Sequence, residues 1–127
     1  MRVATVALVV RNYDEAIAFY RDRLGFDLVT DTPLGTGKRW VMVAAPGGGA
    51  RLLFAQASDA DEASRIGNQT GGRVGFFLET DDFAGDFARF TANGVKFLEA
   101  PRHEPYGSVA VFEDLYGNKW DLIQPAA

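Results

Sequence analysis

Five charged side chains interrupt apolar segments of this 127-residue chain and could bind or transform a small molecule: Arg39, Arg51, Glu79, Glu113 and Asp121. An arginine can hold an anionic group through charge-assisted hydrogen bonds. Two carboxylates such as Glu79 and Asp121 could transfer protons in acid–base catalysis. The sequence does not fix the distance between these two carboxylates, so it identifies no catalytic residue.

The residue types that are missing exclude several other chemistries. There is no cysteine, which excludes disulfides, zinc–thiolate sites, iron–sulfur clusters and a cysteine nucleophile. The one histidine, His103, lies between two prolines in PRHEPYG, where we expect a loop. A Ser–His–Asp triad is therefore not credible.

The net charge of −4 and the sequence pI near 4.9 argue against binding to nucleic acid or to an anionic membrane, either of which needs a basic surface. No apolar stretch approaches the roughly 18 residues of a membrane span. The apolar start of the chain, MRVATVALVV, is interpreted as a buried strand over residues 3–10 and not as a signal peptide. We therefore expect a cytoplasmic protein.

The chain contains one structural pattern twice, offset by 70 residues. VALVVRNYDEAIAFY, from Val6, aligns with FFLETDDFAGDFARF, from Phe76, and each predicts a strand followed by a helix. Asn12 and Asp82 align as N-caps, with Glu15 suited to a capping box in the first copy. Gly25 and Gly94, 69 residues apart, would end the two helices.

Apolar side chains at helical spacing predict one buried stripe on each helix. The members of the two stripes are Tyr13, Ile17, Tyr20 and Leu24, and Phe83, Phe87 and Phe90. FDLVT and VKFLE then predict strands, and the segments from Val41 and Val111 each predict two strands around a turn. The polar residues between the copies predict a connector with one helical turn near Ala60–Arg65.

VALVVRNYDEAIAFYRDRLGF and FEDLYGNKWDLIQ resemble the opening strand and helix and the closing hairpin of the vicinal oxygen chelate superfamily, which contains glyoxalase I, bleomycin-resistance proteins and extradiol dioxygenases. The resemblance implies an α+β fold with two tandem βαβββ modules whose curved mixed sheets enclose a cavity. We expect a single domain over residues 1–127, with module one at 1–56, a connector at 57–72 and module two at 73–127.

Catalytic members of that superfamily hold a divalent metal through four side chains, two from the first strands of the modules and two from the last. The resemblance carries these positions to Thr5, Arg51, Gly75 and Asp121. Only Asp121 suits a metal, because threonine binds weakly, glycine has no side chain and arginine is a cation. We therefore expect no metal and no other cofactor, and the metal-dependent reactions of the superfamily come into doubt.

Strand alternation predicts which side chains face the implied cavity. With Thr5 and Gly75 facing inward, the inward set also contains Phe77, Glu79, Arg51 and Asp121. Pairing across the hairpins adds Arg39, Val41, Val43, Val109, Val111 and Glu113, and it sends Trp40 and Met42 to the core. Arg51 and Asp121 could form a structural ion pair, contact a ligand, or do both.

Such an apolar surface with a few charges predicts a small-molecule site. The candidate ligand-binding residues are Arg39, Arg51, Phe77, Glu79, Tyr106 and Asp121. Tyr106 belongs to the PRHEPYG loop, which could cover the cavity mouth; His103 is either a surface residue or a ligand contact there. The two arginines favour an anionic or hydrogen-bond-accepting ligand.

The leading functional hypothesis is a metal-independent small-molecule binding protein of the bleomycin-resistance type, acting as a homodimer. The alternative is a lyase, isomerase or dioxygenase-like enzyme that uses cavity carboxylates or a non-standard metal site. A regulatory or accessory dimer with a vestigial cavity is the third possibility.

Overall fold

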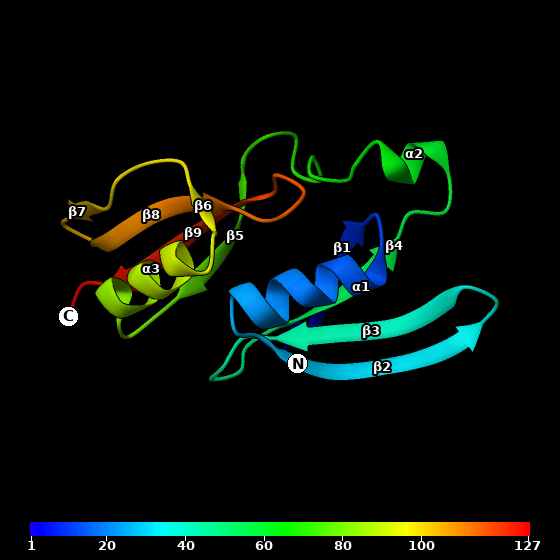
Figure 1. Cartoon of the computed structure of the whole chain (residues 1–127). Coiled ribbons are helices and arrows are strands. Elements are labelled where there is room, and N and C mark those ends of the chain that lie inside the picture. The colour runs from blue at the N-terminus through cyan, green and yellow to red at the C-terminus, as the bar shows by residue number, and fades with distance from the viewer. The chain divides into compact units, whose positions relative to one another are not determined.

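The computed structural model describes residues 1–127, and the chain divides into two units, Met1–Gly67 and Asn68–Ala127 (Figure 1). The boundary falls within the predicted connector. Each unit builds one sheet and packs its own helix against it, as the sequence repeat predicts. The fold is α+β with two mixed sheets, and none of its helices has the length and apolar character needed to cross a membrane.

Unit 1 contains the first βαβββ module and the connector helix. Its elements are β1 (Thr5–Val10), α1 (Tyr13–Ile17), the π-helix η1 (Ala18–Arg23), β2 (Asp27–Gly35), β3 (Lys38–Ala44), β4 (Arg51–Gln56) and α2 (Ala60–Ala63). The strands are ordered β1-β4-β3-β2, with β1 and β4 parallel and the other pairs antiparallel. The predicted helical turn near Ala60–Arg65 is confirmed by α2.

Unit 2 repeats this arrangement and adds a short strand. Its elements are β5 (Val74–Glu79), α3 (Phe83–Ala92), β6 (Lys96–Phe97), β7 (Arg102–Glu104), β8 (Gly107–Glu113) and β9 (Lys119–Pro125). The order is β5-β9-β8-β6, and β7 also pairs with β8. The loop predicted for PRHEPYG is therefore wrong in part, because Arg102–Glu104 bonds to Gly107–Val109 as a strand.

Matching side-chain contacts tie each helix to its sheet. The Oδ1 atom of Asn12 accepts from the Glu15 N–H at 3.0 Å, and Asp82 Oδ1 accepts from the Gly85 N–H at 3.1 Å, which confirms both predicted N-caps. In unit 1, the Tyr13 N–H donates to Gln56 Oε1 at 3.3 Å. In unit 2, the Phe83 N–H donates to Gln124 Oε1 at 2.9 Å.

These equivalent glutamines lie 68 residues apart, whereas the N-caps lie 70 apart. Strand pairing shows the same change of offset, because Leu8 pairs with Phe54 while Leu78 pairs with Leu122. A single offset of 70 therefore holds for the first strand and helix of each module but not for its last strand.

The predicted helical stripes form the two cores. Tyr13, Ile17, Tyr20 and Leu24 are all buried, and the Tyr20 ring packs against Phe26 and Phe54. The π-helix continues this stripe, with the Leu24 N–H donating to the Phe19 carbonyl at 3.3 Å. Gly25 and Gly94 have φ values of 77° and 83°, the left-handed conformation expected at a helix end. In unit 2, Phe83 and Phe90 are buried and half-buried Phe87 packs on Phe97.

Each sheet has a helix face, which packs against its own helix, and a helix-free face on the other side. Alternation along β1 and β4 in unit 1, and along β5 and β9 in unit 2, is as predicted. Leu8, Val10, Leu52, Phe54, Trp120 and Leu122 are buried on the helix faces. The intervening residues, including Thr5, Arg51, Phe77, Glu79 and Asp121, belong to the helix-free faces.

The predicted orientation of β3 is wrong. Val43 pairs with the buried helix-face residue Leu52, and Met42 pairs with Leu53. Val41 and Val43 therefore lie on the helix face together with Arg39, whereas Trp40 and Met42 lie on the helix-free face.

The length of the turn explains this error. Six residues separate β3 from β4, and five separate β8 from β9. A register difference of one residue moves every side chain of a strand to the opposite face. The orientation predicted for β8 is confirmed, because Val111 pairs with Asp121 and Val109 pairs with Ile123.

Candidate functional site

The helix-free face of unit 2 places an aromatic ring beside a carboxylate. Asp121, on β9, has Phe77 of β5 and Val111 of β8 as its paired neighbours. The Phe77 side chain is 65% exposed, more than any other aromatic ring of the chain. Glu79 follows on the same strand and face and is exposed. Sequence alternation therefore placed Phe77, Glu79 and Asp121 together on one surface.

Asp121 lies in an environment that disfavours its charge. The residue is half-buried, and its Oδ1 atom is buried without a hydrogen-bond partner. Burial raises the pKa of the Asp121 carboxyl above its usual range, and the charge of Glu99 raises it further, while the charge of Arg102 acts in the opposite direction. A buried acceptor without a partner is costly, so the ionised Asp121 carboxylate lowers the stability of the folded chain.

Glu99 and Arg102 form an ion pair next to Asp121, and neither residue was predicted from the sequence. Arg102 Nε donates to Glu99 Oε1 at 2.6 Å, and Glu99 Oε2 accepts from the Val111 N–H at 3.3 Å. Arg102 lowers the pKa of the Glu99 carboxyl by hydrogen bonding. Val111 is the paired neighbour of Asp121, so Glu99 is tied to the residue beside the candidate site. Opposite charges three residues apart were the only signal in the sequence.

Tyr106 and His103 have separate surroundings. Tyr106 is 55% exposed, and its hydroxyl accepts from Arg102 Nη1 at 3.4 Å, which connects it to the Glu99–Arg102 pair. His103 Nδ1 lies 2.9 Å from Ser108 Oγ. Ser108 pairs with Gln124, whose side chain bonds to the start of α3. His103 therefore belongs to the helix side of β7, and Arg102 to the same side of the sheet as Asp121.

The helix-free face of unit 1 is mainly apolar. It presents Ala7, Trp40, Met42 and Leu53, and Trp40 is 42% exposed. Arg51 lies at the start of β4, paired with Thr5, and is exposed. The pairing of Arg51 with Asp121 stays a prediction.

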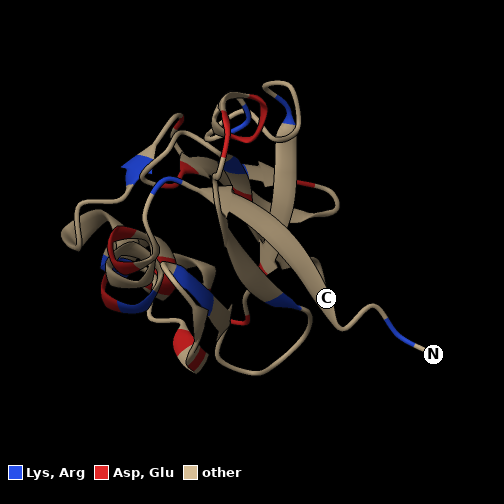
Figure 2. Cartoon of the chain, turned by 90° about the vertical axis from the view of Figure 1, so that its right-hand side faces the viewer, with Lys and Arg blue, Asp and Glu red and all other residues tan.

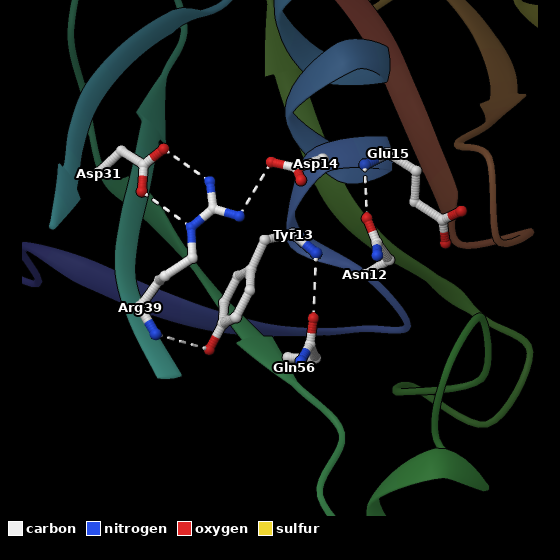
Figure 3. A network of polar contacts seen from close by, with 7 residues as sticks. All are labelled: Asn12, Tyr13, Asp14, Glu15, Asp31, Arg39 and Gln56. Carbon is white, nitrogen blue, oxygen red and sulfur yellow. Dashed lines mark hydrogen bonds and ion pairs between the residues drawn. The ribbon is translucent and has the colours of Figure 1, made fainter. Parts of the chain in front are cut away.

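Arg39 is held on the helix face of unit 1, contrary to its predicted position (Figure 3). Its Nε and Nη2 donate to the two carboxylate oxygens of Asp31 at 3.0 and 2.7 Å, and Nη1 donates to Asp14 at 2.9 Å. The guanidinium lies 5.2 Å from the centre of the Tyr13 ring. These contacts join the β2–β3 hairpin to α1 and lower the pKa of Asp31 through the hydrogen bond from Arg39. With two acidic partners already, Arg39 is poorly suited to recruit an anionic ligand.

The four positions expected for metal ligands do not form a suitable donor set. The offset of 68 makes Leu53, and not Arg51, the unit 1 counterpart of Asp121, so a hydrocarbon side chain occupies this position. Thr5 is a neutral hydroxyl. A Cβ atom at Gly75 would collide with the Thr70 side chain, so no ligating side chain fits there without a rearrangement. No group of three His, Cys, Asp or Glu side chains is gathered to hold a metal ion.

Comparison with known proteins identifies the family. The model of the Glyoxalase/Bleomycin resistance protein/Dioxygenase superfamily matches residues 2–122. The chain belongs to this superfamily. Among curated proteins, an uncharacterised protein from Shewanella frigidimarina is 53% identical over 124 residues, covering 96% of this chain and 92% of that protein.

Solved structures share the fold over nearly the whole chain. TnmS3, an antibiotic binding protein from Streptomyces sp. CB03234, is 31% identical with a TM-score of 0.79, and the match covers 99% of this chain and 97% of TnmS3. UcmS2 is 26% identical with a TM-score of 0.84, covering 97% of both chains. These matches agree with the two βαβββ modules described above.

Proposed function

We propose that this glyoxalase-superfamily protein binds a small organic molecule on the helix-free faces of its sheets, without the help of a metal. The observation that carries the proposal is the juxtaposition of exposed Phe77 with Asp121, whose Oδ1 atom is buried and lacks a partner. An apolar surface with a few placed polar groups suits small-molecule binding. The 31% identity to TnmS3, an antibiotic binding protein, supports the same class of function.

Metal independence is supported by the chemistry of the four inherited positions. Thr5, Leu53 and Gly75 supply no strong ligand, and a single carboxylate such as Asp121 holds a divalent ion poorly. We expect elemental analysis of the dialysed protein to find far less than one equivalent of zinc, nickel, iron or manganese per chain. One retained equivalent would contradict this part of the proposal.

Native mass spectrometry of protein purified without added ligand tests the binding function. The expected result is a fraction of the chain carrying one discrete additional mass that organic solvent releases. The Phe77→Ala variant should lose this mass. Trp40→Ala removes an exposed ring from unit 1 instead, and it is the matched control because unit 2 is the proposed main binding surface. The absence of any bound compound, together with no stabilisation by a library of organic small molecules, would contradict the proposal.

The assembly and location belong to the same proposal. We propose a homodimer, since the helix-free faces leave apolar side chains such as Phe77 and Trp40 accessible. Light scattering at tens of micromolar should give twice the chain mass of 13.8 kDa. We also propose a cytoplasmic location, which fractionation of expressing cells would test.

A further inference from the structure

The charges on the helix-free face of unit 2 favour a ligand of the opposite sign from the one that the sequence suggested. That expectation relied on Arg39 and Arg51. Arg39 is bonded to Asp31 and Asp14 on the helix face of unit 1. Within unit 2, the charge of Arg102 acts on Asp121, but its guanidinium is bonded to Glu99 at 2.6 Å, with Glu104 at 3.5 Å.

The acidic groups of this face are not equally satisfied. Glu113 has a cation, because Lys96 Nζ lies 3.6 Å from its carboxylate. Asp121 forms no ion pair within unit 2, and its Oδ1 atom has no hydrogen-bond partner. Figure 2 shows acidic and basic residues on strands as well as on helices and loops, so Asp121 is distinguished by its lack of an ion pair within unit 2 and not by uncharged surroundings.

The Phe77 ring supplies the second half of an amine site. An aromatic ring of the ligand can stack on the Phe77 ring, while an ammonium group donates hydrogen bonds to a carboxylate more strongly than a neutral group does. Phe77 and Asp121 are paired neighbours on adjacent parallel strands and share one face of the sheet. One ligand can therefore contact both groups.

Resting on the proposed function, we infer that the ligand is a ring-bearing small molecule whose protonated amine donates to the Asp121 carboxylate while its apolar ring packs on Phe77. The negative charge of Asp121 gives this site its selectivity. A ligand without a donor leaves the acceptor unsatisfied, and an anionic ligand meets the carboxylate charge directly. The raised pKa of Asp121 is consistent with a carboxylate that lacks a cation in the unliganded protein.

Three probes of one shape test this inference: 2-(aminomethyl)naphthalene, 2-methylnaphthalene and 2-naphthoate, titrated into the full chain by NMR at pH 7. The amine should bind about tenfold or more tightly than the methyl compound, the range of a charge-assisted hydrogen bond. The carboxylate should bind most weakly. Amide shifts should centre on β5 and β9.

Variants separate the contributions of the two side chains. Asp121→Asn should reduce the preference for the amine to less than about threefold, and Phe77→Ala should weaken all three probes by similar factors. Glu113→Gln is the matched control, since it removes one negative charge from the same face and should leave the preference intact. If Asp121→Asn fails to fold, the Asp121 carboxyl carbon resonance of the wild-type protein should still shift on addition of the amine but not of the methyl compound.

The outcomes that overturn this inference are distinct from failure of the proposed function. Equal binding of the three probes at Phe77 overturns the amine preference and leaves small-molecule binding intact. A rise in amine affinity in Arg51→Ala would show that Arg51 already holds Asp121, which also overturns it. Absence of binding by every probe overturns it as well, and the proposed function falls with it only if native mass spectrometry also detects no bound compound.

Discussion

The two units build the same module and use its surfaces differently. In unit 1, Arg39 of β3 joins a hairpin to α1, and the helix-free face is mainly apolar, with Leu53 at the position of Asp121. In unit 2, Asp121 interrupts the helix-free face, and the Glu99–Arg102 pair lies beside it. The difference shows that a duplicated fold can keep its core pattern while the helix-free faces of its two copies carry different side chains. It also makes each unit a control for the other.

Core truncations test whether the two units are one cooperative domain. Phe54 and Phe112 are buried at 1% and 0% exposure in units 1 and 2. We expect Phe54→Ala and Phe112→Ala each to lower the free energy of unfolding by about 3–5 kcal/mol, through lost burial and the cavity left behind. Chemical denaturation followed by tryptophan fluorescence reports both units, because Trp40 lies in unit 1 and Trp120 in unit 2. Two separate transitions, each shifted by only one variant, would contradict the single-domain prediction.

Arg39→Ala tests the network that distinguishes unit 1. We expect a loss of about 0.5–1.5 kcal/mol at pH 7, because the pair with Asp31 is partly shielded while the pair with Asp14 is exposed. The pKa of Asp31 is lower in the folded protein, so this stabilisation is complete above about pH 4, the usual pKa in an unfolded chain, and disappears as the pH falls through the lowered value.

Thermal unfolding of wild type and Arg39→Ala between pH 2 and pH 7 measures this effect. Asp14→Asn is the matched control, since it removes the exposed partner and should cost less than Asp31→Asn. A difference between wild type and Arg39→Ala that stays constant down to pH 2 would show that Arg39 acts through packing on Tyr13 and not through its charge.

Asp121→Asn should change stability in the opposite direction. Because burial raises the pKa of Asp121, the folded protein binds a proton there more readily than the unfolded chain does. The ionised group therefore costs stability at pH 7, and its removal should add a few tenths of a kcal/mol, up to about 1. The gain should shrink as the pH falls through the raised pKa and be absent below about pH 4. A destabilised variant at pH 7, measured by urea denaturation, would indicate that Asp121 already has a cationic partner.

His103→Ala should have the smallest effect. His103 bonds to Ser108 on the helix side of β7 and is exposed. We expect the affinity for the naphthalene amine to change by less than twofold and the stability by less than about 0.5 kcal/mol. Tyr106→Phe is the comparison on the other side of the sheet. Loss of the hydroxyl that bonds to Arg102 should weaken binding of the naphthalene amine more than His103→Ala does. A larger effect at His103 would assign it to the ligand site.

The sequence by itself determined the repeat, both N-caps, the helical stripes and the faces of β1, β4, β5 and β9. These features depend on contacts between residues close in the chain or on strict alternation, so spacing alone is sufficient to find them. Phe77, Glu79 and Asp121 were placed on one face for that reason. The lack of cysteine excludes thiol chemistry through composition alone.

Only the tertiary structure decided the orientation of β3, the counterpart of Asp121 and the surroundings of its carboxylate. The turn between β3 and β4 contains three consecutive glycines, and its sequence allows more than one register. Pairing of Met42 with Leu53 fixes that register and thereby moves Arg39 to the helix face. A pairing register depends on hydrogen bonds between separate strands, and a change of one residue reverses every side chain. Spacing along the chain does not contain that information.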